Sequence, residues 1–490
     1  MERLRVQRTD ADTAGASAET TAGSPRRCLS TFDAIAITVG IVIGTFIFIA
    51  PSMVAARTSG PGEFLTLWVL GGLVSLIGAL CYAELSAAYP DCGGDYYFLS
   101  RAYGGGLAFL YAWARLTVIQ TGSIALLAFA IGKYGTALHE LGPHSTAIYA
   151  AAVVVLLTAL NLIGLREGKW LQIVLTTCEV LGVLLLIVAG FWIAGRGDGG
   201  GSSAPAAAAA ASSGARDIGL AMVFVLLTYG GWNEAAYLSA EVRERNGIAK
   251  ALFWSLAIVT VIYLLANVSL LLGLGLPAVA ASGAVAADLL GKAFGPLGAT
   301  IMSAIVIIAT ASTANATIFT GARTNYAVGR DVPLLGRIGR WDAARNTPRN
   351  GLILQGVIAL LLVLFGALTN GLQTMIDYVT PVFWLFFLLV GVALFVMRSR
   401  EPDAPRPFRV PLYPLTPTLF CLACAYMLWS SVSYLFQPWV QAGIGTVVGL
   451  GVLAMGVPLM LIARPGRRRE QKRGFEPVMA ERIVDVSRLN

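Results

Sequence analysis

The sequence predicts an all-α polytopic membrane protein with twelve transmembrane helices, and three observations carry that prediction. First, 57% of the residues are hydrophobic and only 13% are charged, whereas soluble domains are about 25% charged. Second, twelve apolar windows reach the roughly 20 residues that a helix needs to cross a bilayer. Third, glycines interrupt two of these windows, although a backbone opened in lipid leaves polar groups unpaired.

The apolar windows follow one another along most of the chain, separated by short polar segments. They lie at residues 32–57, 64–88, 106–132, 146–164, 169–194, 218–240, 249–275, 297–322, 351–369, 374–397, 412–435 and 440–463.

Basic residues predict how these helices are oriented, because positively charged loops stay on the cytoplasmic side of a membrane. With the N-terminus inside, the predicted outer loops contain only Arg57, Lys133, Arg196, Arg216 and Lys292, whereas the C-terminal tail carries the run "RPGRRREQKR". We therefore expect a protein of the plasma membrane with both termini in the cytoplasm. The net charge of +8 then reflects topology, and no nucleic-acid partner is expected.

The two interrupted windows contain "GIVIGTFIF" at 40–48 and "LLTYGGWNEAAY" at 226–237. An opened turn at membrane depth is tolerated only where it is buried in protein or lines a cavity. Glycine is also common in membrane helices for close packing, so either break alone is a weak signal. Two broken helices at corresponding positions of two halves, however, are typical of secondary transporters built from inverted repeats.

This pairing predicts a five-plus-five inverted repeat with broken helices 1 and 6, followed by two additional C-terminal helices. The expected segments are a disordered cytoplasmic tail at 1–30, a transmembrane domain at 31–464 and a basic cytoplasmic tail at 465–490. Within the domain we expect repeat one at 31–194, a low-complexity outer linker at 195–216, repeat two at 217–397, and helices 11 and 12 at 411–463.

Several stretches, in order along the chain, resemble the amino acid, polyamine and organocation (APC) transporter superfamily. They are "GIVIGTFIF" followed by "APSMVA", then "YAELSAAYPDCGGDYYFLSRAYG", "YGGWNEAAYLSAEV" and "STANATIFTGARTNYAVGRD". The resemblance runs from Phe32 to Arg464 and points to bacterial amino acid permeases related to the L-type branch. It implies an amino acid substrate, alternating access, and a site at mid-membrane between helices 1, 3, 6, 8 and 10.

The two helix breaks form the candidate substrate site. Broken helix ends expose N–H groups that suit a carboxylate and carbonyl groups that suit an ammonium, and an amino acid carries both charges. The candidate substrate-binding residues are Ile43, Gly44, Thr45, Phe46, Leu227, Tyr229, Gly230 and Gly231.

Two of these residues depart from the pattern that the resemblance implies. Gly44, Thr45 and Phe46 correspond to a Gly-Ser/Ala-Gly triplet, so a benzyl group replaces a glycine that lets the substrate approach the main chain. Leu227 stands where the family commonly has a bulky aromatic residue. Either Phe46 fills the volume that Leu227 vacates, which predicts small substrates such as alanine, glycine or serine, or the two changes only repack the helices.

Glu179, near the middle of the fifth window, is the candidate coupling residue, because a charge at membrane depth is costly. Proton-coupled relatives resemble one another in having a lysine at the corresponding place. Here a carboxyl group would carry a proton or bind a cation, and Ser312 and Thr313 match the region that completes this site in relatives. A Glu that serves only helix packing is the third alternative.

Other charged residues near the predicted site receive weaker roles. Arg115 lies inside the third window and needs an internal partner, for which Glu179 and Gln120 are the candidates, unless it reaches the interface. Glu84, Asp91, Asp95 and Arg101 surround the first inner loop and are interpreted as an inner gate or a structural latch.

The residue types argue against catalysis. The two histidines, His139 and His144, share one outer loop, and no cluster has the spacing of a metal site or a catalytic triad, so neither a metal nor another cofactor is expected. The expected partners are an amino acid substrate, a proton or alternatively sodium, and the lipid bilayer, with no obligatory protein partner. The alternatives are a transporter of polyamines or other organic cations, and a nutrient sensor with a transporter fold.

Overall fold

The computed structural model describes residues 29–463 except 92, 164–168, 198, 200–217, 240–241, 245, 332–335, 341, 343–346 and 434–442. Nearly all of the predicted tails and most of the predicted linker at 195–216 lie outside the described residues. The division into segments, including the five-plus-five repeat, therefore stays a prediction.

The predicted all-α polytopic membrane fold is confirmed. Among the described residues, ten helices are long and apolar enough to cross a membrane, and they lie at Pro61–Ala88, Gly105–Leu138, Ser145–Ile163, Thr177–Gly195, Gly247–Leu274, Val285–Tyr326, Arg349–Ala367, Leu372–Arg400, Leu415–Ser433 and Ile444–Ile462. Two shorter apolar helices, α1 (Thr31–Val42) and α10 (Ile218–Thr228), occupy the first and sixth predicted windows. These are the two windows that the glycines interrupt.

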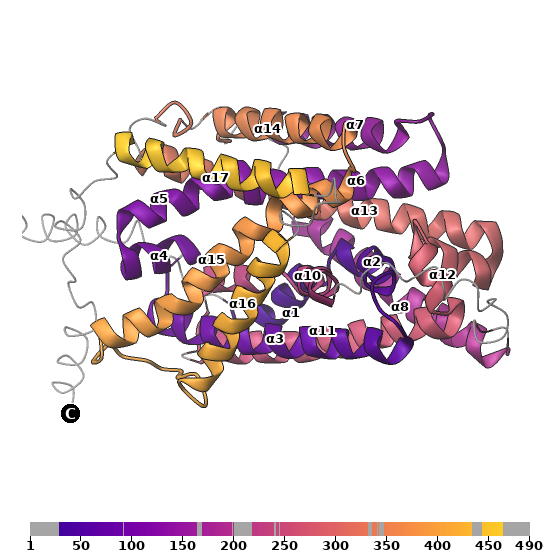
Figure 1. Ribbon diagram of the computed structural model, residues 1–490, viewed down its shortest axis with the longest axis horizontal. Coiled ribbons are helices and arrows are strands. Elements are labelled where there is room, and N and C mark those ends of the chain that lie inside the picture. The colour runs from indigo at the N-terminus through magenta and orange to yellow at the C-terminus, as the bar shows by residue number, and fades with distance from the viewer. Residues whose placement is uncertain are drawn as a thin grey trace, which may run out of the picture.

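Most of the helices run lengthwise in one bundle, with α1 and α10 near its centre (Figure 1). The elements around them are α3 (Pro61–Ala88), α4 (Asp95–Tyr103), α5 (Gly105–Ala114), α6 (Gln120–Leu138), α7 (Ser145–Ile163), α8 (Lys169–Gly195), α11 (Gly247–Leu274), α12 (Leu276–Ala281), α13 (Val285–Asp331), α14 (Arg349–Ala367), α15 (Leu372–Arg400), α16 (Leu415–Ser433) and α17 (Ile444–Ala463).

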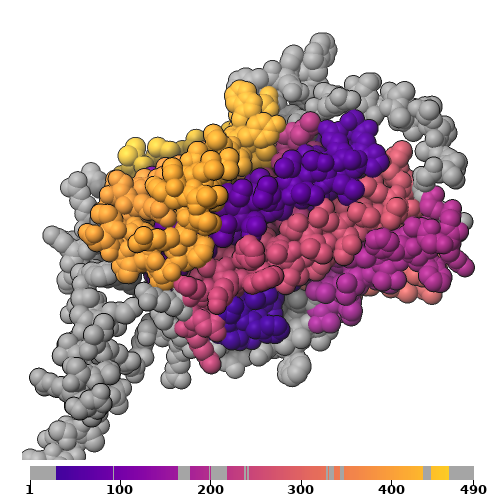
Figure 2. Space-filling view, turned by 90° about the horizontal axis from the view of Figure 1, so that it is seen from below, coloured from indigo at the N-terminus to yellow at the C-terminus, as the bar shows by residue number. Residues whose placement is uncertain are grey.

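The outer faces of these helices carry large apolar side chains. Leu73 of α3, Trp254 of α11, Leu361 of α14 and Trp429 of α16 are all exposed. Figure 2 looks at one such face, where α16 in orange, α3 in indigo and α11 in pink lie side by side. Apolar side chains are compatible with the hydrocarbon core of a bilayer, so this distribution is typical of helices that face lipid.

Three departures from regular helix were not predicted. Helix α13 begins at Val285, before the predicted window at 297–322, and bends at Gly295, whose φ is +71°, just before Pro296. A π-helical turn, η2 (Arg115–Ile119), joins α5 to α6. After the glycines at 93 and 94, the chain forms the short helix α4.

Candidate functional site

The first break lies between α1 and α2 (Ala50–Ala55). Helix α1 ends at Val42, Ile43 and Gly44 have extended backbones, and a 3₁₀ turn, η1 (Thr45–Phe48), follows. Because the first N–H groups of a new helical segment have no partner within it, the chain near Thr45 presents donors. The carbonyl groups at the end of α1 present acceptors beside them.

The second break follows α10. Helix α10 ends at Thr228, and Gly231 adopts a left-handed conformation with φ +99° and ψ −22° before the 3₁₀ segment η3 (Trp232–Leu238). A β-carbon on Gly231 would lie 3.1 Å from both the carbonyl oxygen and Cγ2 of Ile41 in α1. The two broken helices therefore touch at this glycine.

Buried tyrosines bind carbonyl groups at these irregular places. The Tyr263 hydroxyl of α11 lies 2.7 Å from the carbonyl oxygen of Val42 and 3.2 Å from that of Thr228. Tyr134 donates to the carbonyl of Phe48 at 2.7 Å, and Tyr378 donates to that of Thr117 in the π-helical turn at 2.8 Å. Freed backbone groups at membrane depth need such partners. The sequence showed only tyrosines inside apolar windows, so these roles were missed.

Both breaks open onto one cavity of about 380 Å³. Its lining includes nine of the eleven predicted site residues, namely Gly44, Thr45, Phe46, Leu227, Gly230, Gly231, Glu179, Ser312 and Thr313. The two exceptions are Ile43 and Tyr229, whose side chains are buried in the helix packing away from the cavity. Tyr229 donates instead to the carbonyl of Trp68 at 3.1 Å, because its ring points toward α3.

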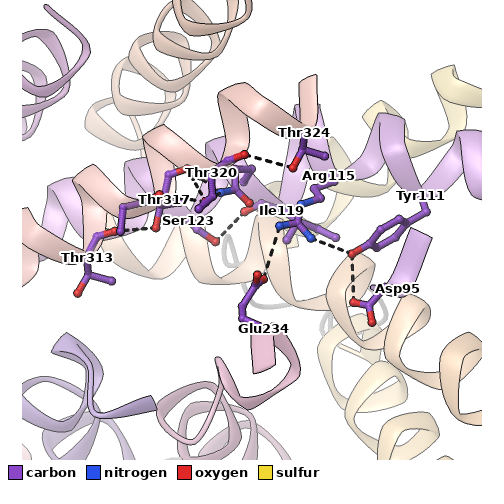
Figure 3. Close-up of polar contacts among 12 residues, drawn as sticks. Asp95, Tyr111, Arg115, Ile119, Ser123, Glu234, Thr313, Thr317, Thr320 and Thr324 are labelled. Atoms are coloured by element: carbon purple, nitrogen blue, oxygen red, sulfur yellow. Dashed lines mark hydrogen bonds and ion pairs between the residues drawn. The ribbon is translucent and has the colours of Figure 1, made fainter. Parts of the chain in front are cut away.

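One wall of the cavity is polar and comes from α6 and α13 (Figure 3). The Gln120 side chain donates to the carbonyl of Thr317 at 2.7 Å, and the Thr317 hydroxyl donates to the carbonyl of Thr313 at 2.8 Å. Ser123 likewise donates to the carbonyl of Ile119 at 2.6 Å. Because these hydroxyl protons are taken by backbone carbonyls, the oxygen atoms remain as acceptors for a ligand.

Another part of the lining is apolar and aromatic. It is formed by Phe383, Phe386 and Phe387 of α15, together with Ile376 and Val379. A cavity with an apolar part and a few convergent polar groups is typical of a small-molecule site.

A chain of polar side chains extends from α4 to η3 along the cavity (Figure 3). Asp95 accepts a hydrogen bond from the Tyr111 hydroxyl at 3.1 Å, and Arg115 donates to the same hydroxyl at 3.2 Å. Arg115 lies 3.6 Å from the carboxylate of Glu234, which was not among the candidate partners considered from the sequence. Burial and, next, the nearby Glu234 carboxylate raise the pKa of Asp95 to about 6.

Glu179 lies in the cavity lining on α8 and is only 4% exposed. Its Oε1 has no hydrogen-bond partner among the described residues. Helix α8 packs tightly here, because a β-carbon on Gly182, one turn later, would lie 2.7 Å from Ile305 of α13 and 3.6 Å from Phe48 of η1. Ser312 and Thr313 line the same cavity from α13.

Other charged residues around the loop between α3 and α4 bind outside the cavity. The fully buried Glu84 accepts hydrogen bonds from Arg398 at 2.7 Å and from the backbone N–H of Val410 at 2.7 Å. Arg101 forms an ion pair with Glu401 at 2.8 Å. These contacts join α3 and α4 to residues at the C-terminal end of α15 and just after it, outside the residues that line the cavity.

Comparison with known proteins gives a consistent result. The family model described as amino acid permease matches residues 29–453. The chain is 30% identical over 405 residues to the human b(0,+)-type amino acid transporter 1, covering 81% of each protein. It is 29% identical over 439 residues to the mouse large neutral amino acids transporter small subunit 2, covering 88% of this chain and 79% of the relative. With its broken helices and central cavity, the chain belongs to the amino acid permease family.

Proposed function

We propose that this permease moves amino acids across the plasma membrane by alternating access, with the substrate held between the two helix breaks. One observation carries the proposal: both breaks open onto the same cavity, so donors and acceptors of the main chain face one ligand. Family membership points to a transporter rather than an enzyme. The distribution of basic residues supports termini on the cytoplasmic side.

In this proposal the main chain recognises what all amino acids share. The N–H groups near Gly44 and Thr45 receive the α-carboxylate, and the carbonyl groups that end α1 and α10 receive the α-ammonium. The side chain then extends along the wall of hydroxyl groups and phenylalanines. Phe46, which lines the cavity at the first break, limits the size of that side chain and favours alanine, glycine or serine.

Glu179 is the proposed coupling group. A carboxyl group with a buried oxygen and no described partner is costly to leave charged, so it suits a proton that is taken up and released as access alternates. We place proton coupling or amino acid exchange ahead of sodium symport. Sodium binding by Glu179, Ser312 and Thr313 is the competing coupling mode.

Transport of an organic cation is the second candidate function, because the described side chains that line the cavity include more acidic than basic groups. Three carboxyl groups, those of Asp95, Glu179 and Glu234, line the cavity together with one described cationic side chain, that of Arg115. A polyamine has no carboxylate and would leave the N–H groups of the first break unused. A screen that includes putrescine therefore separates the two candidates.

Counterflow in proteoliposomes that contain only this purified chain tests the proposal. Vesicles are loaded with one unlabelled amino acid and diluted into a trace of the labelled compound, for each of the twenty amino acids and for putrescine. We expect transient accumulation of labelled amino acids. Ligand binding without accumulation would indicate a nutrient sensor, and accumulation only of putrescine would indicate a cation carrier.

The same vesicles test whether a protein partner is needed. The relative named a small subunit is, by that name, part of a larger assembly. For this chain we propose that no obligatory partner is required, so the purified chain alone should exchange substrate.

A further inference from the structure

Gln120, at the start of α6, is a buried amide on the polar wall of the cavity. It is only 8% exposed, and its Nε2 donates to the carbonyl of Thr317 at 2.7 Å and to the Thr320 hydroxyl at 3.3 Å. A carbonyl only accepts hydrogen bonds, so the contact with Thr317 fixes which end of the amide faces α13. The other end, Oε1, accepts a hydrogen bond from no described residue. This acceptor is left for a ligand in the cavity.

The hydroxyl groups beside Gln120 also offer acceptors. Thr320 donates to the carbonyl of Ala316 at 2.9 Å. Ser123 and Thr317 likewise donate to carbonyls one turn earlier in their own helices, and all three hydroxyls belong to the same wall (Figure 3). Because their protons are occupied, only lone pairs remain for a ligand. A ligand group that donates a hydrogen bond therefore matches this wall, and a group that only accepts does not.

The charge near Gln120 favours a donor that is neutral. The backbone N–H of Gln120 bonds the carbonyl of Arg115 across the π-helical turn η2, and both residues line the cavity. The guanidinium of Arg115 opposes a second cation nearby, and its ion pair with Glu234 at 3.6 Å makes that carboxylate less available to one. Phe46 also lines the cavity and limits the length of the ligand. A short side chain that ends in a hydroxyl meets these conditions.

We propose that Gln120 is a specificity-determining residue that selects substrates with a side-chain hydroxyl, so that serine and threonine are preferred over amino acids of the same size without one. Its Oε1 accepts the hydroxyl proton of the substrate. When a methyl group takes the place of that hydroxyl, the amide oxygen is covered without a donor, and this costs binding free energy. The inference rests on the proposed function, since it assumes that an amino acid binds between the breaks.

A role in helix packing alone is the alternative, and Gln355 of α14 is a matched control for it. Gln355 is also buried, and it donates at 3.1 Å to the carbonyl of Ile318, the residue after Thr317. Its Oε1 already accepts from Asn325 at 3.2 Å, and it is not among the residues that line the cavity. A β-carbon on Gly321 of α13 would collide with both glutamine side chains. Replacement of Gln355 therefore removes a comparable bond to α13 outside the proposed site.

The first test uses the wild-type chain in proteoliposomes, with the amino acid that accumulates fastest in counterflow as the labelled tracer. The competitors are L-serine, L-2-aminobutyrate, which has a methyl group in place of the hydroxyl, and O-methyl-L-serine, which keeps the oxygen but lacks the proton. We expect serine to inhibit half-maximally at a concentration about fivefold lower than either analogue, as one neutral hydrogen bond allows. L-2,4-Diaminobutyrate, whose short side chain ends in an ammonium, should inhibit more weakly than serine.

The second test compares Gln120→Met with Gln355→Met, since methionine has a similar length and lacks the amide. Gln120→Met should raise the half-inhibitory concentration of serine about fivefold and leave that of L-2-aminobutyrate unchanged. Gln355→Met should keep the wild-type ratio of the two concentrations. This ratio does not depend on the amount of folded protein, so a general loss of stability would not imitate the expected result.

Equal inhibition of the wild type by serine and L-2-aminobutyrate would overturn the inference, as would stronger inhibition by L-2,4-diaminobutyrate than by serine. Equal weakening of serine and L-2-aminobutyrate by Gln120→Met would assign Gln120 to packing. If Gln120→Met does not fold, the comparison of competitors on the wild type decides the question. A wild-type protein that exchanges no amino acid would instead defeat the proposed function, and this inference with it.

Discussion

Replacement of Gly231 by alanine tests whether the opened backbone of the sixth helix is needed for transport. Gly231 has φ +99°, a conformation that residues with a β-carbon rarely adopt, and the added β-carbon would lie 3.1 Å from two atoms of Ile41. Strain of this kind costs about 1–3 kcal/mol. If the open conformation is the one that binds, its population and hence the apparent affinity should fall by roughly 5- to 150-fold.

The assay is the initial rate of substrate uptake by proteoliposomes as a function of substrate concentration, normalised to folded protein. Gly142→Ala is the matched control, because Gly142 also has a positive φ of +114° but lies in the loop between α6 and α7 with open space around it. We expect Gly142→Ala to lower thermal stability and leave the half-saturating concentration unchanged. Gly231→Ala with wild-type affinity would refute the idea that the break forms the site.

Three further predictions concern coupling, size and pH. Glu179→Gln should keep substrate exchange but lose accumulation driven by a pH gradient, because the amide cannot carry a proton. A variant whose uptake is still driven by the gradient, or a wild type whose uptake needs sodium at constant pH, would contradict the proton role. Phe46→Gly should extend exchange from alanine to leucine and phenylalanine, and an unchanged substrate range would remove Phe46 from the site. The pKa of Asp95 is raised from 3.8 to about 6, so the folded protein binds the protonated carboxyl group more favourably than the carboxylate. Ionisation of Asp95 above pH 6 therefore costs about 3 kcal/mol of folding stability. The midpoint of thermal unfolding of the wild type, relative to that of Asp95→Asn, should therefore rise as pH falls from 7.5 to 5, and parallel profiles would contradict the assignment.

Most membrane helices could be predicted because each one needs a long apolar run, and such runs are visible in the sequence. The breaks could be predicted too, because glycines at 44, 230 and 231 interrupt apolar windows. The short helices were harder. Helix α4 has no long apolar run, and the start of α13 lies before a Gly-Pro kink, so a hydropathy window passes over both.

Contacts between distant helices could not be predicted from local patterns. Arg115 lies beside Glu234, which is far along the chain in η3 after the second helix break, whereas the candidates considered from the sequence were Glu179 and Gln120. Likewise, Tyr229 belongs to the glycine motif but points toward α3, because the side chains around a turn diverge in direction. Tyr263 had no motif at all, since only the fold brings its hydroxyl to the ends of α1 and α10.

A structure determined with the best exchanging amino acid bound at saturation tests most directly whether the two helix breaks hold the substrate. We predict that the α-carboxylate accepts hydrogen bonds from backbone N–H groups at Gly44 to Phe46, and that the α-ammonium contacts the carbonyl groups of Val42 and Thr228. A substrate bound elsewhere, or one whose α-carboxylate is held by the guanidinium of Arg115 instead of the main chain, would contradict the account.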